Sequence, residues 1–371
     1  MSKSILLLCF LASVASCTPM RVSPPESVDE LLSGVALFGE EVGVSDISES
    51  EVLALDDDMR EFVRAKAGGL PTAKSRLRRL LKGMITDGLL SLDYDPNLTY
   101  TAKQTFHSRQ GNCLSFSNLF VAMAREANLE VSFQMVDIPP SYNSEGDFVL
   151  LNNHINILVS GIRSDTTFMQ DFVVDFNTAE YNGNYDTKKM SDTYALALYF
   201  SNRSVESMQQ NDIRSAFRFL KKGIQLDPEI AGLWVNLGVL YSRNQHDEFA
   251  VQSYQQALSI QSSNKSALVN LVAVLGRLDR PSEADYYLSQ VTYYRDHNPY
   301  YHYSLGQAAF NRREFNMALV NLDDAIRLKK DEHQFYYLQG LVYLAIEDIA
   351  KADRSFVNAK KHAEREQLIS A

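Results

Sequence analysis

Three side chains that can together perform acyl transfer follow one another along the chain: the thiol of Cys113, the imidazole of His154 and the carboxylate of Asp175. A thiol attacks a carbonyl carbon once a base removes its proton, and a carboxylate can hold that base in the required orientation. Cys113 directly follows a Gly111-Asn112 turn and precedes an apolar run. The alternative roles for this cysteine are a buried structural thiol, half of a disulfide and a metal ligand.

Other polar residues compete for the same roles. His107 stands six residues before Cys113 and is a second candidate base, although it lies on the same approach segment. Asp171 is a second candidate for the carboxylate, but Asp175 is nearer to the loop that follows its strand. The acidic run from Asp56 to Asp58 is interpreted as the solvated start of a helix and not as a calcium site.

The cysteine count limits the roles of Cys113. Cys9 lies in an N-terminal segment with one lysine and an apolar stretch too short to cross a bilayer, which is typical of an export signal. The tetrad that ends at Cys17 resembles a bacterial lipobox, which implies a signal peptide over 1–16, acylation of Cys17 and a tether over 17–27. Cys113 then has no partner within the chain, so a disulfide and a cysteine-rich metal site are both excluded.

The same reading predicts a protein anchored by lipid in the bacterial cell envelope. Thr18 follows Cys17 where known inner-membrane lipoproteins carry aspartate, which favours the outer membrane, facing the periplasm. A plain secretory signal with a chance cysteine is the alternative.

The segments around the three residues predict how they are positioned. After Cys113 apolar residues recur at helical spacing, so the cysteine is expected to open a helix, whose free amides would lower the thiol pKa and hold an oxyanion. "HINILVSG" and "DFVVDF" alternate with a period of two and predict two strands that begin at His154 and end near Asp175. A helix followed by strands indicates an α+β domain.

This segment resembles the transglutaminase-like superfamily, through "TYTAKQTFHSRQGNCLSFSNLFVAMAREANL", "NNHINILV" and "FVVDFN". The resemblance implies a papain-like site in which Cys113 attacks an amide, His154 acts as base and then acid, and Asp175 holds the imidazole. It also implies an oxyanion donor upstream of the cysteine, at Gln110 or Gln104. We assign this domain to residues 28–196.

The second half of the chain repeats itself every 34 residues. Trp234, Leu237, Gly238 and Tyr241, followed by small residues that recur at the same spacing, resemble the tetratricopeptide repeat. Five contiguous repeats fit 197–366, so the expected fold is an α+β papain-like/transglutaminase-like domain followed by an all-α tetratricopeptide repeat solenoid.

Such arrays leave a concave surface for a protein or peptide partner. The thirteenth repeat position, which faces this surface in the family, is Arg243 and Arg277 here, and Tyr300, Tyr303 and Tyr337 are expected further along the same groove. Paired guanidinium groups and aromatic rings suit an extended peptide that bears a carboxylate. The alternative is that both arginines are solvated and pair with local acids.

Composition narrows the function. The net charge of −10 makes nucleic acid an unlikely partner, because phosphate binding needs clustered lysine and arginine. No cofactor is expected. The leading hypothesis is a lipid-anchored thiol enzyme, a peptidase or amidase, whose repeats recruit the substrate. A non-catalytic interaction scaffold and a transamidase that crosslinks proteins are the alternatives.

Overall fold

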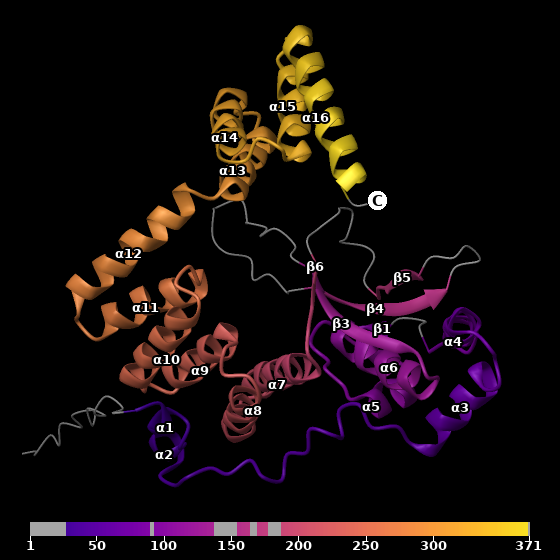
Figure 1. Cartoon of the computed structure of the whole chain (residues 1–371). Coiled ribbons are helices and arrows are strands. Elements are labelled where there is room, and N and C mark those ends of the chain that lie inside the picture. Colours follow the sequence, from indigo (N-terminus) through magenta and orange to yellow (C-terminus); the bar gives the residue numbers. More distant parts are fainter. Residues whose placement is uncertain (1–26, 90–92, 137–153, 164–168, 177–186, 370–371) are drawn as a thin grey trace, which may run out of the picture.

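The computed structural model describes residues 27–89, 93–136, 154–163, 169–176 and 187–369. Its first half builds a small sheet around a buried helix, and its second half is a run of paired helices (Figure 1). This is the α+β domain followed by an all-helical solenoid that the sequence predicts. Cys9, Cys17 and the predicted tether up to residue 26 lie outside the described residues.

The sheet positions the three candidate residues. It has four antiparallel strands in the order β5-β4-β3-β6, formed by Glu130–Val136 (β3), His154–Arg163 (β4), Met169–Val174 (β5) and Thr187–Lys189 (β6). Val136 at the end of β3 lies opposite His154, and Val174 at the end of β5 lies opposite Ile157. The start of β4 and the end of β5 therefore meet at one end of the sheet.

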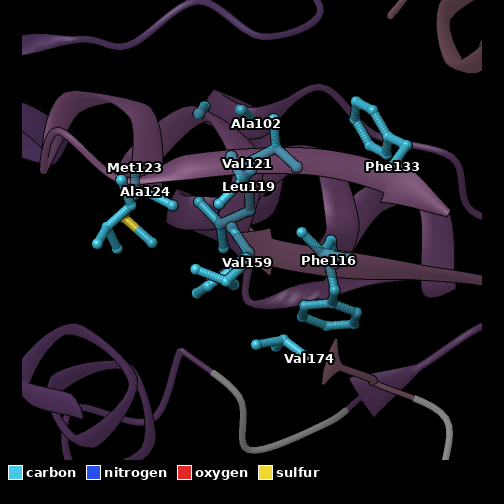
Figure 2. Close-up of a cluster of buried hydrophobic side chains, with 14 of the residues drawn as sticks. Ala102, Phe116, Leu119, Val121, Met123, Ala124, Phe133, Val159 and Val174 are labelled. Carbon is cyan, nitrogen blue, oxygen red and sulfur yellow. The ribbon is translucent and has the colours of Figure 1, made fainter. Parts of the chain in front are cut away.

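Helix α6 (Cys113–Glu126) is the centre of the first core. Every residue from Leu114 to Ala124 is buried, because the helix is covered by the sheet and by neighbouring helices at once. Phe116 and Phe120 both contact Phe176, just beyond β5, with ring centroids 6.1 and 6.0 Å apart. Figure 2 shows this cluster, with α6 side chains directed at strand residues such as Val159.

The first half also contains other helices and a short strand pair. They are α1 (Val28–Leu31), α2 (Val35–Phe38), α3 (Asp57–Ala67), α4 (Ala73–Thr86), α5 (Ala102–Ser108) and a two-stranded parallel pair, β1 (Asp93–Tyr94) with β2 (Gln110–Gly111). Helices α3 and α4 contribute apolar side chains to the core around α6.

The helical half consists of five helix pairs. They are α7 (Asp192–Gln209) with α8 (Ile213–Leu226), α9 (Ala231–Arg243) with α10 (Asp247–Ile260), α11 (Lys265–Arg277) with α12 (Pro281–Asp296), α13 (Pro299–Asn311) with α14 (Phe315–Leu328), and α15 (His333–Ala345) with α16 (Ile349–Ile369). The small residues of the repeat let paired helices cross closely: a Cβ on Gly238 would lie 2.4 Å from the Tyr254 ring.

The two halves share elements. Helix α7 places Tyr199 and Phe200 in the core around α6 and Ala197 in the core of the first repeats. Its start at Asp192 precedes the boundary at 197 drawn from the sequence. The boundary between the two predicted domains therefore falls inside one continuous helix.

The segment that contains α1 and α2 packs on the repeats and not on the sheet. Leu31 and Val42 belong to the same core as Phe217 of α8. The Tyr241 hydroxyl donates to the carbonyl of Leu31 at 2.6 Å, and the buried Lys221 ammonium donates to the carbonyl of Val42 at 2.8 Å. The predicted domain 28–196 thus contributes side chains to both cores.

The stacking of the repeats changes at α12, which contributes no buried residue. Leu288 of α12 is 48% exposed, whereas the residues one period away, Tyr254 and Leu322, are 1% and 0% exposed. Helices α13 to α15 have a separate apolar core. Figure 1 shows α13 to α16 displaced from the earlier pairs. The spacing of 34 residues continues through α12, but the side chain that is buried at this repeat position in the neighbouring repeats is exposed in α12.

None of the helices described here is both long and apolar enough to cross a membrane.

Candidate functional site

The start of α6 is held by a network of short polar contacts. Asn112 caps the helix by accepting from the amide of Ser115 at 3.0 Å, and its own side-chain amide donates to Thr99 at 2.7 Å. The Ser115 hydroxyl donates to the carbonyl of Leu98 at 3.1 Å. Gly111 has φ 147°, and a Cβ there would lie 2.5 Å from Ser115. The Gly-Asn turn therefore places Cys113 in the first turn of the helix.

His154 and Asp175 form a buried pair. The Nε2 atom of His154 lies 2.8 and 2.6 Å from the two carboxylate oxygens of Asp175, and the side chains are 6% and 14% exposed. The pairing follows from the sheet, because His154 begins β4 and Asp175 directly follows the adjacent β5. A carboxylate on Nε2 holds the ring in the tautomer that carries its proton there, which directs Nδ1 to act as the base.

Asp171 lies within β5 and its side chain is exposed. It is the third residue of the strand, which begins at Met169. Asp175, and not Asp171, is the carboxylate that binds His154.

The sulfur of Cys113 lies in a partly buried position beside the first residues of β4. Burial raises the pKa of the Cys113 thiol above its ordinary value, the backbone N–H groups of Leu114 and Ile155 act in the opposite direction, and the charge of Asp175 adds to the rise. The expected lowering of this pKa by the helix terminus is therefore wrong in direction, because desolvation outweighs the amide contribution.

The other residues around the site have local partners. The Nε2 atom of His107 lies 2.7 Å from Asp56, which caps α3 by accepting from the amide of Met59 at 2.9 Å. The acidic run is thus a helix start, and His107 is engaged there. The Gln104 side chain accepts from the amide of Thr101 at 3.0 Å in the capping box of α5, and it is exposed.

Gln110, the other candidate oxyanion donor, lies in the short strand β2, immediately before the turn that leads to Cys113. Its backbone is fixed by pairing with Asp93. The role of its side chain stays a prediction.

Three residues of the predicted groove contact partners within the chain. Arg277 is held by both carboxylate oxygens of Asp247, at 2.6 and 3.0 Å, so it pairs with a local acid as the alternative reading expects. Tyr300 donates to Glu332 at 2.7 Å and Tyr303 packs on Phe335 at 5.2 Å.

The predicted groove is also divided. Arg243 and Arg277 lie before the change in stacking at α12, whereas Tyr300, Tyr303 and Tyr337 lie after it. Of the three tyrosines, Tyr337 is the exposed one, at 54%. The groove stays a prediction for Arg243 and Tyr337.

Residues that the sequence analysis did not single out also belong to this site. Asn112 and Thr99 hold the turn before the nucleophile, and the signal was an asparagine directly before an apolar run with serine at the third helical position. Asn156 lies two residues after His154, is 1% exposed, and lies opposite Gln134 of β3. No sequence signal distinguishes this asparagine from an ordinary polar strand residue.

Within the described ranges no group of three or more histidine, cysteine or acidic side chains is arranged to hold a metal ion.

Two protein-family models match parts of this chain. Residues 60–142 match the model of the Transglutaminase-like superfamily, and residues 231–264 match that of a Tetratricopeptide repeat. The first match includes Cys113 and ends before His154. The chain thus carries a transglutaminase-like domain followed by tetratricopeptide repeats, as the sequence indicated. Comparison with curated proteins finds no significant match.

Several solved structures are similar to this chain. MamA from Desulfovibrio magneticus RS-1 is 19% identical, with 48% of this chain and 98% of that chain covered and a TM-score of 0.27. YrrB, a TPR protein with an unusual peptide-binding site, is 20% identical over 45% and 86% of the two chains, with a TM-score of 0.26. PilF from Pseudomonas aeruginosa is 18% identical over 45% and 76%, with a TM-score of 0.25.

Proposed function

We propose that this protein is a thiol enzyme that cleaves or transfers an amide bond of a protein or peptide substrate through an acyl-enzyme on Cys113, with the repeats recruiting the substrate. The observation that carries the proposal is the buried pair of His154 and Asp175, whose ring nitrogen and carboxylate lie 2.6 to 2.8 Å apart at the end of the sheet beside the cysteine helix. The family match over the cysteine segment supports the same chemistry.

The reaction divides into two acyl transfers. His154 Nδ1 takes the proton from the Cys113 thiol as the sulfur attacks the carbonyl carbon, and the amides at the start of α6 stabilise the oxyanion. The protonated imidazole then gives its proton to the leaving amine, and the C–N bond breaks to leave a thioester. Water attacks the thioester in hydrolysis, or a second amine attacks it in transfer, and the thiol is restored.

The raised pKa of the Cys113 thiol determines at which step its proton is transferred. A thiol that rests protonated has to lose its proton during the attack, so His154 acts as a general base. Asp175 stabilises the positive imidazole that results.

Trapping the acyl-enzyme tests the proposal. After brief incubation with p-nitrophenyl acetate and an acid quench, mass spectrometry should locate an acetyl group on Cys113 of the native protein. The His154→Ala variant should acylate at least tenfold more slowly, and Cys113→Ala should carry no adduct at this position. An equal rate in the His154→Ala variant would leave the scaffold alternative as the better account.

Hydrolysis and transfer are separated by the acceptor. A glutamine-containing peptide incubated with a labelled primary amine gains the label only if the acyl-enzyme passes its acyl group to the amine. A peptidase or amidase instead releases a cleaved peptide or free acid, and a crosslinking transamidase conserves the amide.

The lipid anchor belongs to the same proposal. Cys17→Ser should either release the protein from the membrane fraction or leave an uncleaved precursor, because the acylated sulfur is lost. Fractionation and intact mass measurement check this. Native protein that is soluble and has a free Cys17 thiol would contradict an anchored location in the cell envelope.

A further inference from the structure

A pocket of about 710 Å³ lies where the sheet meets the repeats. Its lining includes Thr187 and Lys188 of β6 and Tyr194 of α7. It also includes Gly232 near the start of α9 and Asn264, which caps α11. Both parts of the chain therefore contribute to one cavity, whose volume lies in the range of ligand sites in proteins.

The strand register connects this pocket to the candidate catalytic site. Thr187 lies opposite Val136, and Val136 lies opposite His154 on the next strand. Neighbouring strands are about 4.8 Å apart, so the backbones at Thr187 and His154 are separated by roughly 10 Å. That distance corresponds to about three residues of extended chain.

Strand β6 is at the edge of the sheet among the described strands, and its three residues are exposed. An edge strand offers backbone N–H and C=O groups to an extended peptide, which can add to the sheet as a further strand. The rest of the lining is mixed in polarity and includes the apolar side chains of Leu198 and Ile230 and the polar ones of Ser201 and Gln261. A polypeptide backbone with mixed side chains suits this lining better than a purely apolar molecule.

We propose that this pocket, between β6 and the start of α9, binds the extended segment of the substrate polypeptide that lies next to the scissile amide. This inference rests on the proposed function and names its substrate as a chain that is unfolded over several residues. The pocket positions the amide for Cys113, and a folded surface without an extended segment is not a substrate. The first repeats thereby form part of the substrate site itself.

Two glycines allow a matched test. Gly232 lines the pocket, and a Cβ built on it meets nothing within 4 Å, so a tyrosine there fills the pocket without straining α9. Gly276 in α11 is equally unobstructed and does not line the pocket. Gly232→Tyr is the test variant and Gly276→Tyr its control, both made in full-length protein that carries Cys113→Ala so that bound peptides are not consumed.

The probe is a phage-displayed library of random twelve-residue peptides. Peptides selected on the Cys113→Ala protein are labelled with fluorescein, and the anisotropy of the label measures their binding. Their Kd should rise at least tenfold with Gly232→Tyr and change less than twofold with Gly276→Tyr.

Selected peptides that bind the Gly232→Tyr protein as tightly as its parent would overturn the inference, as would a library that yields no binders. If Gly232→Tyr fails to fold, Ser201→Tyr on α7 fills the same pocket and is judged by the same criterion. Peptides that depend on Gly232 while the native protein forms no acyl-enzyme would support the binding pocket and refute the proposed catalysis, so the two failures are distinguishable.

Discussion

At the scale of single residues, Asp171 and Asp175 make a direct comparison. Asp175, directly after β5, holds His154 through two short contacts, whereas Asp171 within β5 is exposed. Asp175→Asn should lower the rate of Cys113 acylation by about 10²- to 10⁴-fold, because the neutral amide neither orients the imidazole nor stabilises its positive form. Asp171→Asn should leave the rate unchanged. Stopped-flow release of p-nitrophenol measures both, and similar losses would argue against Asp175 as the orienting residue.

The protonation of Cys113 is a second property of a single residue. Burial raises the thiol pKa above its ordinary value of 9.0, so the midpoint of alkylation by iodoacetamide against pH should be higher in the native protein than in urea. The folded state then favours the neutral thiol, and its contribution to the free energy of unfolding is complete below pH 9.0 and declines as pH rises further. A native midpoint below that of the unfolded chain would instead indicate a stabilised thiolate.

At the scale of the helix, the change in stacking at α12 predicts unequal costs for equivalent substitutions. Leu322→Ala removes a fully buried side chain and should lower the free energy of unfolding by about 2–5 kcal/mol. Leu288→Ala, one repeat period earlier, should lower it by less than about 0.5 kcal/mol, because this leucine is 48% exposed. Urea titrations measure both. Equal costs would mean that α12 and α13 are stacked in solution.

At the scale of the whole molecule, the segment that contains α1 and α2 packs on the repeats. Tyr241→Phe removes the donor to the buried carbonyl of Leu31 while keeping the ring, which should cost about 1–3 kcal/mol locally. Hydrogen exchange should become faster at residues 28–42 and stay unchanged in α6. Lys221→Met, which removes the donor to Val42, should have the same pattern. Equal acceleration in α6 would show that the two cores open together.

The local elements follow from nearest-neighbour patterns in the sequence. The Asn112 cap and the apolar run after Cys113 specify the start of α6, and a period of two specifies β4 and β5. The 34-residue spacing specifies the helix pairs, since Gly238, Gly306 and Gly340 recur at positions where two helices cross closely. These features depend on contacts within one element or between adjacent ones, so the order of residues is enough to indicate them.

The arrangement of these elements in space depends on the tertiary structure. Asp175, and not Asp171, reaches His154 because of the order and register of the strands. Burial raises the pKa of the Cys113 thiol, and this burial depends on everything packed around the sulfur, which no local pattern records. Helix α7 contributes to both cores, and the segment around Leu31 packs on Tyr241. Leu288 is exposed although its repeat position is buried in the neighbouring repeats. Each of these depends on residues far apart in the chain, whose proximity is a property of the folded molecule.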